Sequence, residues 1–153
     1  MNGNILVKNK KFLPGKDWVW YAPNTTDAYG KEEIKAVNNA LKNGWLTPGK
    51  ITAEFENKVA GLYGKKYWLF VNSGSSANLI ALEAYKFKKG SEIITPACNF
   101  NTTVSPIIQT GLVPVFIDVE LGKYTIDVSQ LGKALSKKTV AVMAPHLIGN
   151  FVD

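Results

Sequence analysis

A run of small polar residues near the middle of the chain has the composition of an anion-binding turn. Residues 72–76 combine one asparagine, three serines and one glycine, and stand between an apolar run, 67–71, and a helical pattern of leucine and isoleucine. The first N–H groups of a helix have no partner inside the helix, and the helix dipole is positive at that end. We therefore predict that Gly74, Ser75 and Ser76 hold a phosphate-bearing ligand. A serine that only caps a helix after a buried strand is the alternative.

Phe100 and His146 are two further side chains that could contact a ligand, because each follows a strand-like run. Phe100 comes after 92–95, where its ring could lie flat against a planar ligand; packing into the core is the alternative. His146, the only histidine, comes after 139–144 and could hydrogen-bond a ligand; a histidine held by backbone groups is the alternative. Pyridoxal phosphate and nucleotides both present a phosphate and a planar ring. The usual nucleotide fingerprints, GxGxxG and GxxxxGKS/T, are absent from the sequence.

Alternating strands and helices are expected to position these side chains. The predicted strands are 67–71, 92–95, 113–117 and 139–144, and the predicted helices between them are 75–87, 102–110 and 128–135. This order implies an α/β fold in three layers, α-β-α, with a mostly parallel sheet between the helices. Since the carboxyl ends of parallel strands meet at one edge of a sheet, the turn, the ring and the histidine should share one crevice.

The remaining segments have simpler interpretations. Two helices, 31–43 and 52–63, precede the alternating part, and residues 1–26 read as an N-terminal arm whose aromatic cluster must pack on something. Pro106 should confine the regular part of its helix to the later turns, because proline lacks an N–H. Asp118 follows a strand and is expected to cap a turn or a helix.

Composition excludes several classes of protein. The formal net charge of +6 comes from 18 lysines without a single arginine, the side chain best suited to recognising bases and phosphates, so a nucleic-acid partner is not expected. No apolar run approaches the roughly 20 residues of a membrane span, so no membrane partner is expected, and the start lacks the pattern of a secretion signal. One cysteine, Cys98, fits a reducing cytoplasm; we expect an inert buried thiol there and no metal site.

Several motifs, in their order and spacing, resemble the DegT/DnrJ/StrS family of sugar-nucleotide aminotransferases, which are pyridoxal-phosphate enzymes of fold type I. The motifs are 44–49, 72–78, 92–97, 111–119 and 145–149, and the resemblance covers about residues 25 to 153. It implies that 27–153 form the N-terminal portion of the large, cofactor-binding domain of such a transferase. The residue that carries the cofactor would then lie beyond Asp153, and the chain alone would be inactive.

The resemblance also implies roles for the candidate site residues. Gly74, Ser75 and Ser76 would hold the cofactor phosphate, mainly through backbone N–H groups and a hydroxyl. Phe100 would stack on the pyridine ring, and His146 would lie near the edge of the cofactor.

Trp45 and Thr47 would border the sugar or the site of a partner subunit, since such enzymes are usually homodimers with shared active sites.

Two positions depart from the family, because most members have threonine at Ser75 and an apolar residue at Asn78. Residues 72–78, together with 102–104 and 149–150, resemble the CDP-linked 4-keto-6-deoxyglucose 3-dehydratase branch, in which a histidine replaces the cofactor-binding lysine. We therefore expect an enzyme that uses pyridoxal phosphate or pyridoxamine phosphate (PLP or PMP) on a nucleotide-linked keto-deoxysugar, by aminotransfer or C-3 dehydration. The alternative is a non-catalytic, truncated α/β domain that binds a phosphate or a nucleotide.

Overall fold

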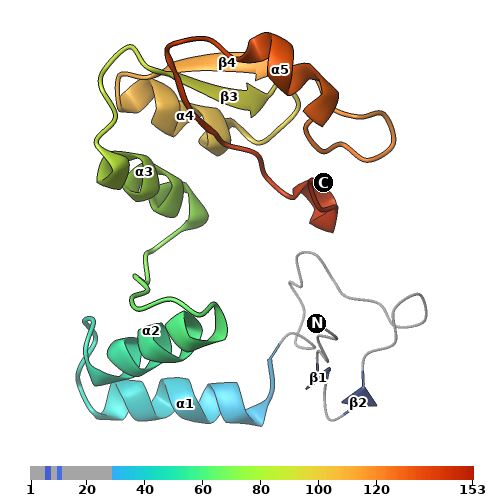
Figure 1. The fold of residues 1–153 in the computed structure, drawn as a ribbon. Helices are drawn as coiled ribbons and strands as arrows, with labels where there is room; N and C mark the ends of the chain where they lie inside the picture. Colours follow the sequence, from blue (N-terminus) through green and yellow to red (C-terminus); the bar gives the residue numbers. More distant parts are fainter. Residues whose placement is uncertain (1–5, 8–9, 12–28) are drawn as a thin grey trace. The chain divides into compact units, whose positions relative to one another are not determined.

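A computed structural model describes residues 6–7, 10–11 and 29–153 (Figure 1). The chain divides into two compact units, 1–64 and 65–153. The predicted arm, 1–26, lies outside the described residues apart from two short strands, β1 (Leu6–Val7) and β2 (Lys10–Lys11), which pair antiparallel. The division into an arm and a large domain at residue 26 stays a prediction. No helix in the described ranges is long and apolar enough to cross a membrane.

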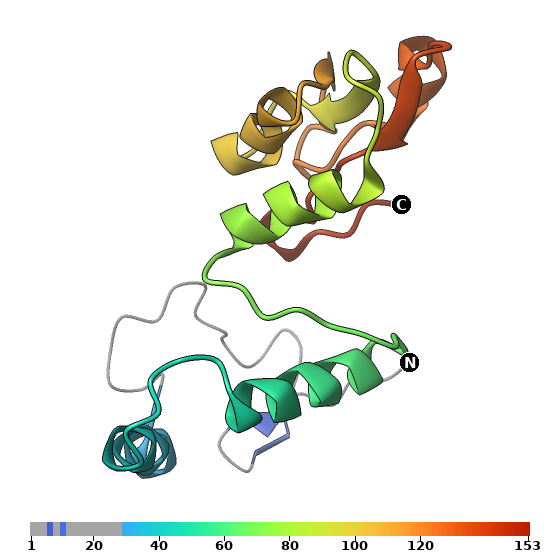
Figure 2. The ribbon, with the colours of Figure 1, turned by 90° about the vertical axis from the view of Figure 1, so that its left-hand side faces the viewer.

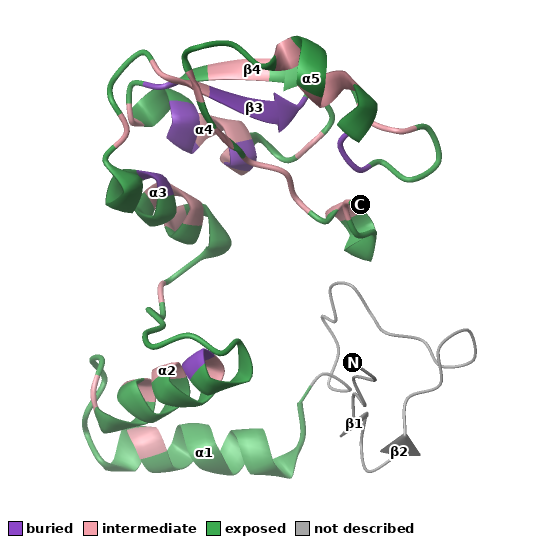
Figure 3. Cartoon of the chain, in the orientation of Figure 1, coloured by how far each residue is buried: buried purple, intermediate pink, exposed green. Residues whose placement is uncertain are grey.

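The described part of the first unit contains two helices, α1 (Lys31–Lys42) and α2 (Lys50–Leu62). α1 begins after Gly30, whose N–H donates to the carboxylate of Glu33 at 2.6 Å, a favourable pairing at the positive end of a helix. Both helices agree with their predicted ranges except at the ends. Their surfaces are mostly exposed (Figure 3). The large apolar side chains that α1 exposes are Ile34, Val37 and Leu41.

The second unit is built on a three-stranded parallel sheet in the order β4-β3-β5 (Figure 1). The strands are β3 (Glu92–Pro96), β4 (Val113–Ile117) and β5 (Thr139–Val142). β3 is in the middle, where Ile94 pairs with Val115 on one side and with Val142 on the other. It is therefore the most buried of the three strands (Figure 3).

Helices cover both faces of this sheet (Figure 2). They are α3 (Gly74–Tyr85), α4 (Asn101–Gln109) and α5 (Leu131–Ala134). On one face Leu82 of α3 and Ile107 of α4 form a core cluster with Ile93. On the other face α5 packs against a cluster that contains Ile94 and Ile117. β3 contributes to both clusters because successive strand residues point to opposite faces, and the predicted three-layer α/β fold is confirmed.

The predicted strand at 67–71 is wrong, because these residues form neither a strand nor a helix. Tyr67 and Leu69 are exposed rather than packed in a sheet. A strand needs a neighbour that pairs with its N–H and C=O groups, and the sheet of the second unit contains only β4, β3 and β5 within the described residues. The apolar composition of residues 67–71 thus indicates a propensity to form a strand. It does not indicate whether another strand is available to pair with it.

Two helices differ from their predicted form. α4 continues through Pro106, whereas the sequence predicts regular helix only in the later turns. The side chain of Asn78 replaces the hydrogen bond that the proline removes. The predicted helix 128–135 is a 3₁₀ turn, η2 (Val128–Gln130), followed by the single turn of α5.

Candidate functional site

Residues 73–76, the serine corner, form the start of α3. Ser73 has an extended backbone, and its hydroxyl oxygen accepts a hydrogen bond from the N–H of Ser76 at 3.1 Å. The N–H of Ala77 donates to the carbonyl oxygen of Ser73 at 3.0 Å. The N–H groups of Gly74 and Ser75, which precede these two, have no hydrogen-bond partner in the part of the chain that the structure describes.

The serine corner presents these unpaired donors to open space. An ideal Cβ on Gly74 would meet no atom within 4 Å, and Ser75 is exposed. Two adjacent unpaired N–H groups at the positive end of a helix, beside a serine hydroxyl, have the chemistry that binds phosphate. The serine cap, which is the alternative interpretation, is present as well. It uses Ser73 and Ser76 and leaves the first two donors of the helix available.

Phe100 caps the start of α4, and it is 69% exposed. The alternative interpretation, in which Phe100 packs into the core, is therefore wrong. The ring is accessible to a ligand. The turn before it is held by Asn99, whose side-chain amide donates to the carbonyl oxygen of Pro96. The hydroxyl of Thr95 and the side-chain oxygen of Asn99 are buried without a hydrogen-bond partner among the described residues. Such unpaired polar atoms are rare in folded proteins, and departures of this kind concentrate at functional sites.

α3 and α4 pack side by side (Figure 2), and one side-chain hydrogen bond joins them near their starts. The Nδ2 atom of Asn78 donates to the carbonyl oxygen of Thr102 at 3.1 Å. Asn78 lies one turn after Gly74, and Thr102 follows Phe100 closely in the chain. The structure thus brings the serine corner and the turn of Phe100 onto neighbouring helix starts. In the sequence Asn78 is notable only as a departure from the family pattern. Pro106, one turn after Thr102, does indicate that the carbonyl of Thr102 needs a donor from outside the helix, because proline has no N–H.

His146 follows β5 at the sheet edge where β3 leads to Phe100, since the two strands are parallel neighbours. Its Nδ1 atom accepts a hydrogen bond from the N–H of Val152 at 3.1 Å. The ring proton therefore belongs on Nε2, which remains a donor. The ring also lies 5.0 Å from the ring of Phe151, tilted by 57°. Both interpretations of this histidine are compatible, because a backbone group holds one nitrogen and the other can bind a ligand.

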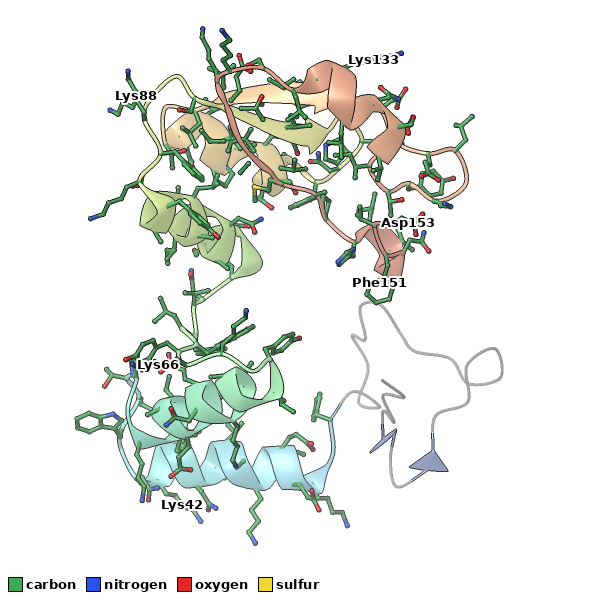
Figure 4. The ribbon with its side chains drawn as sticks, in the orientation of Figure 1. Lys42, Lys66, Lys88, Lys133, Phe151 and Asp153 are labelled. Atoms are coloured by element: carbon green, nitrogen blue, oxygen red, sulfur yellow. The ribbon has the colours of Figure 1, made fainter. Side chains whose placement is uncertain are left out.

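The segment after His146 is attached to the turn after β4. The side-chain amide of Asn150 donates to the carbonyl oxygen of Lys123 at 2.7 Å. The ammonium group of Lys123 pairs with Glu120 at 2.6 Å and with Asp153, labelled in Figure 4, at 3.4 Å. Hydrogen bonds to these two carboxylates raise the pKa of Lys123. The contacts of Asn150 and Asp153 thus restrain the loop that carries His146.

Trp45 and Thr47, the predicted substrate residues, belong to the first unit. Both line a cavity of about 400 Å³ between the end of α1 and the start of α2. The indole Nε1 of Trp45 donates to the carbonyl oxygen of Pro48 at 3.4 Å, and the backbone of Gly49 lies against the same ring. The cavity has the size of a small-ligand site, and the role of these residues toward a substrate stays a prediction.

Cys98 and Asp118 follow β3 and β4, and both differ from what the sequence predicts. Cys98 is exposed, so the expected buried thiol is wrong. It lies in the bend beyond β3, after the chain has left the sheet. The expected cap at Asp118 is wrong as well, because its carboxylate accepts from the N–H of the adjacent residue, Val119, at 2.8 Å. Val119 pairs with Ile126 as an isolated bridge, so Asp118 begins neither a turn nor a helix. No group of three or more histidine, cysteine or acidic side chains that could hold a metal occurs within the described ranges.

A model of one protein family matches most of the chain. The DegT/DnrJ/EryC1/StrS aminotransferase family matches residues 27–153. The chain belongs to this family. The matched region contains the serine corner, Phe100 and His146, and the resemblance expected from the sequence motifs is confirmed.

Known proteins similar to this chain include a dehydratase and an aminotransferase. The lipopolysaccharide biosynthesis protein RfbH of Salmonella typhimurium is 39% identical over 96% of this chain and 35% of its own length. The structure of E coli GDP-4-keto-6-deoxy-D-mannose-3-dehydratase with bound hydrated PLP is 35% identical, with a TM-score of 0.71 over 74% of this chain and 31% of its own. The aminotransferase from Psychrobacter cryohalolentis is 27% identical, with a TM-score of 0.74 over 80% of this chain and 31% of its own. The chain thus spans about a third of the length of these relatives.

Proposed function

We propose that the protein is a PLP-dependent enzyme that acts on a nucleotide-linked keto-deoxysugar. Family membership supports this, as does similarity to a dehydratase that has bound PLP and is named for a GDP-linked keto-deoxysugar. The observation that carries the proposal is the pair of unpaired N–H groups, on Gly74 and Ser75, at the positive end of α3. The open space beside Gly74 leaves room for the cofactor phosphate.

The residues of the second unit fit such a cofactor. The N–H groups of Gly74 and Ser75, together with the hydroxyls of Ser75 and Ser76, would bind the phosphate. The exposed ring of Phe100 would stack on the pyridine, and the Nε2–H of His146 would donate a hydrogen bond at the edge of the cofactor. When bound, PLP supplies an electron sink for the reaction, while these residues bind and orient it.

Removal of the C-3 hydroxyl of the sugar is the reaction that we propose over aminotransfer. The 3-dehydratase is 35% identical to this chain, against 27% for the aminotransferase. Ser75 and Asn78, which resemble the dehydratase branch, favour the same reaction. A non-catalytic phosphate-binding domain receives no support from the family match.

The protein is further proposed to work as a homodimer in the cytoplasm, with a nucleotide-linked sugar as its small-molecule partner. The exposed apolar stripe of α1 would be covered in a dimer. A single cysteine and a nucleotide-sugar substrate both fit a reducing compartment. Neither a nucleic-acid partner nor a membrane partner is proposed.

Titration of the complete gene product with PLP, followed by borohydride treatment, tests the proposal. We expect a complex that loses its cofactor on denaturation even after borohydride, because the proposed dehydratase holds PLP without a covalent bond to lysine. Covalent retention of the cofactor would refute dehydration and support aminotransfer. Replacing Phe100 by alanine should weaken PLP binding about fivefold without lowering the melting temperature, since the ring is exposed. A wild-type protein that does not bind PLP would refute the proposed function.

A further inference from the structure

One carbonyl oxygen of α4 loses its usual hydrogen bond because of Pro106. In a regular helix the carbonyl of Thr102 would accept from the N–H of residue 106, and proline has no N–H. The preceding carbonyl, that of Asn101, accepts an additional bond from the hydroxyl of Ser105 at 2.9 Å. Without a donor from elsewhere, the carbonyl of Thr102 would be left unpaired in a partly buried position, which is unfavourable.

Asn78 supplies the missing donor. Its Nδ2 atom lies 3.1 Å from the carbonyl oxygen of Thr102, across 24 positions of sequence. Within the described residues no other side-chain hydrogen bond joins α3 to α4. Residues four apart share one face of a helix, so Asn78 lies on the same face as Gly74. The bond therefore connects the phosphate end of the proposed site to the ring end, at Phe100.

The buried apolar cluster that α3 and α4 share lies farther along both helices. Leu82 and Ile107 belong to the buried cluster against β3, about one turn beyond Asn78 and Thr102. Hydrophobic packing is non-directional, whereas a hydrogen bond holds two atoms at a set distance and angle. The separation of the two helix starts is therefore controlled by the Asn78 bond more closely than by the apolar cluster.

We propose that Asn78 is a positioning residue that sets the separation between the serine corner and the ring of Phe100 through the carbonyl of Thr102. This inference rests on the proposed function, because it requires a ligand that carries both a phosphate and a ring. Two probes separate these requirements. PLP needs both ends of the site, whereas inorganic phosphate needs the serine corner alone.

Three variants of the complete protein test this role: Asn78→Leu, Pro106→Ala and the double variant. Asn78→Leu removes the bond, and we expect PLP binding to weaken about tenfold while phosphate affinity stays within about twofold. Pro106→Ala restores an N–H to α4, so the double variant satisfies the carbonyl of Thr102 without the link to α3. We expect the double variant to recover the thermal stability lost in Asn78→Leu, but not the affinity for PLP.

Pro106→Ala alone keeps Asn78 and is the reference for the double variant, because both lack the proline ring. Unchanged PLP affinity in Asn78→Leu would overturn the proposal, as would an equal loss of affinity for both probes. Recovery of PLP affinity in the double variant would also overturn it, because Asn78 would then only satisfy a carbonyl. A wild-type protein that binds no PLP would instead refute the proposed function, so the two failures are distinguishable.

Discussion

Replacing Ser75 by aspartate should separate the folding of the serine corner from its ability to bind a ligand. Ser75 is the second residue of α3 and is exposed, and its N–H has no partner in the described structure. A carboxylate in the first turn of a helix interacts favourably with the helix dipole, by about 0.3–1 kcal/mol. The Ser75→Asp variant should therefore fold as well as the wild-type protein, with an equal or slightly higher melting temperature.

The same carboxylate would repel a bound phosphate. A charge of −1 at about 5 Å from a charge of −2 raises the free energy by about 1.7 kcal/mol at the dielectric constant of water, and by about 7 kcal/mol at an effective value of about 20. Because Ser75 is exposed, the lower figure is the appropriate minimum. It corresponds to a loss of affinity of about 15-fold.

The assay is titration of Ser75→Asp with PLP and with inorganic phosphate, alongside thermal unfolding. Ser75→Asn is the matched control for the charge, because asparagine has nearly the size of aspartate without its charge, and both variants lack the Ser75 hydroxyl. Binding of both ligands that is about 15-fold weaker in Ser75→Asp than in Ser75→Asn, at an unchanged melting temperature, is the expected result. Unchanged affinity in Ser75→Asp would refute the assignment of a phosphate to this helix start.

Two further predictions concern the loop that contains Trp45 and the ion pairs of Lys123. A Cβ on Gly49 would lie 2.5 Å from Nε1 of Trp45, so Gly49→Ala should displace the indole and shift its NMR signal. Gly61→Ala, where a Cβ meets nothing within 4 Å, is the control, and an indole signal that does not move in Gly49→Ala would contradict the packing. The carboxylates that raise the pKa of Lys123 above 10.5 stabilise the fold below that pH, and this contribution is lost as pH rises through the raised value. The melting temperature of the wild-type protein should therefore approach that of Lys123→Met in strongly alkaline solution, and a difference independent of pH would argue against the ion pairs.

Local patterns in the sequence predicted the elements whose formation depends on neighbouring residues. The strand 113–117 has the predicted bounds, and α1 follows the apolar spacing and the acidic first turn from which it was predicted. The run 67–71 has equally strong strand propensity and failed, because no strand in the described structure pairs with it. Propensity is a property of a segment, whereas a sheet requires two segments to meet.

The candidate site likewise has features that the sequence predicts and features that only the structure shows. The small polar turn before α3 was identified from residue types alone, because capping and the helix dipole act within one turn of a helix. Its unpaired donors, however, could be assigned only once Ser73 was seen to bond the N–H of Ser76 rather than that of Gly74 or Ser75. The sequence is compatible with a bond from the Ser73 hydroxyl to any of these N–H groups, and the backbone geometry of the turn selects that of Ser76.

The sequence by itself determined the family, the order of helices and strands after residue 74, and the place where a phosphate could bind. These follow from periodicity, capping and side-chain chemistry, which act over a few residues. Only the tertiary structure decided that Cys98 and Phe100 are exposed, and that Asn78 meets the carbonyl left unpaired by Pro106. Such outcomes depend on which distant segments come together, and a hydrogen bond across 24 positions leaves no periodic signal in either segment.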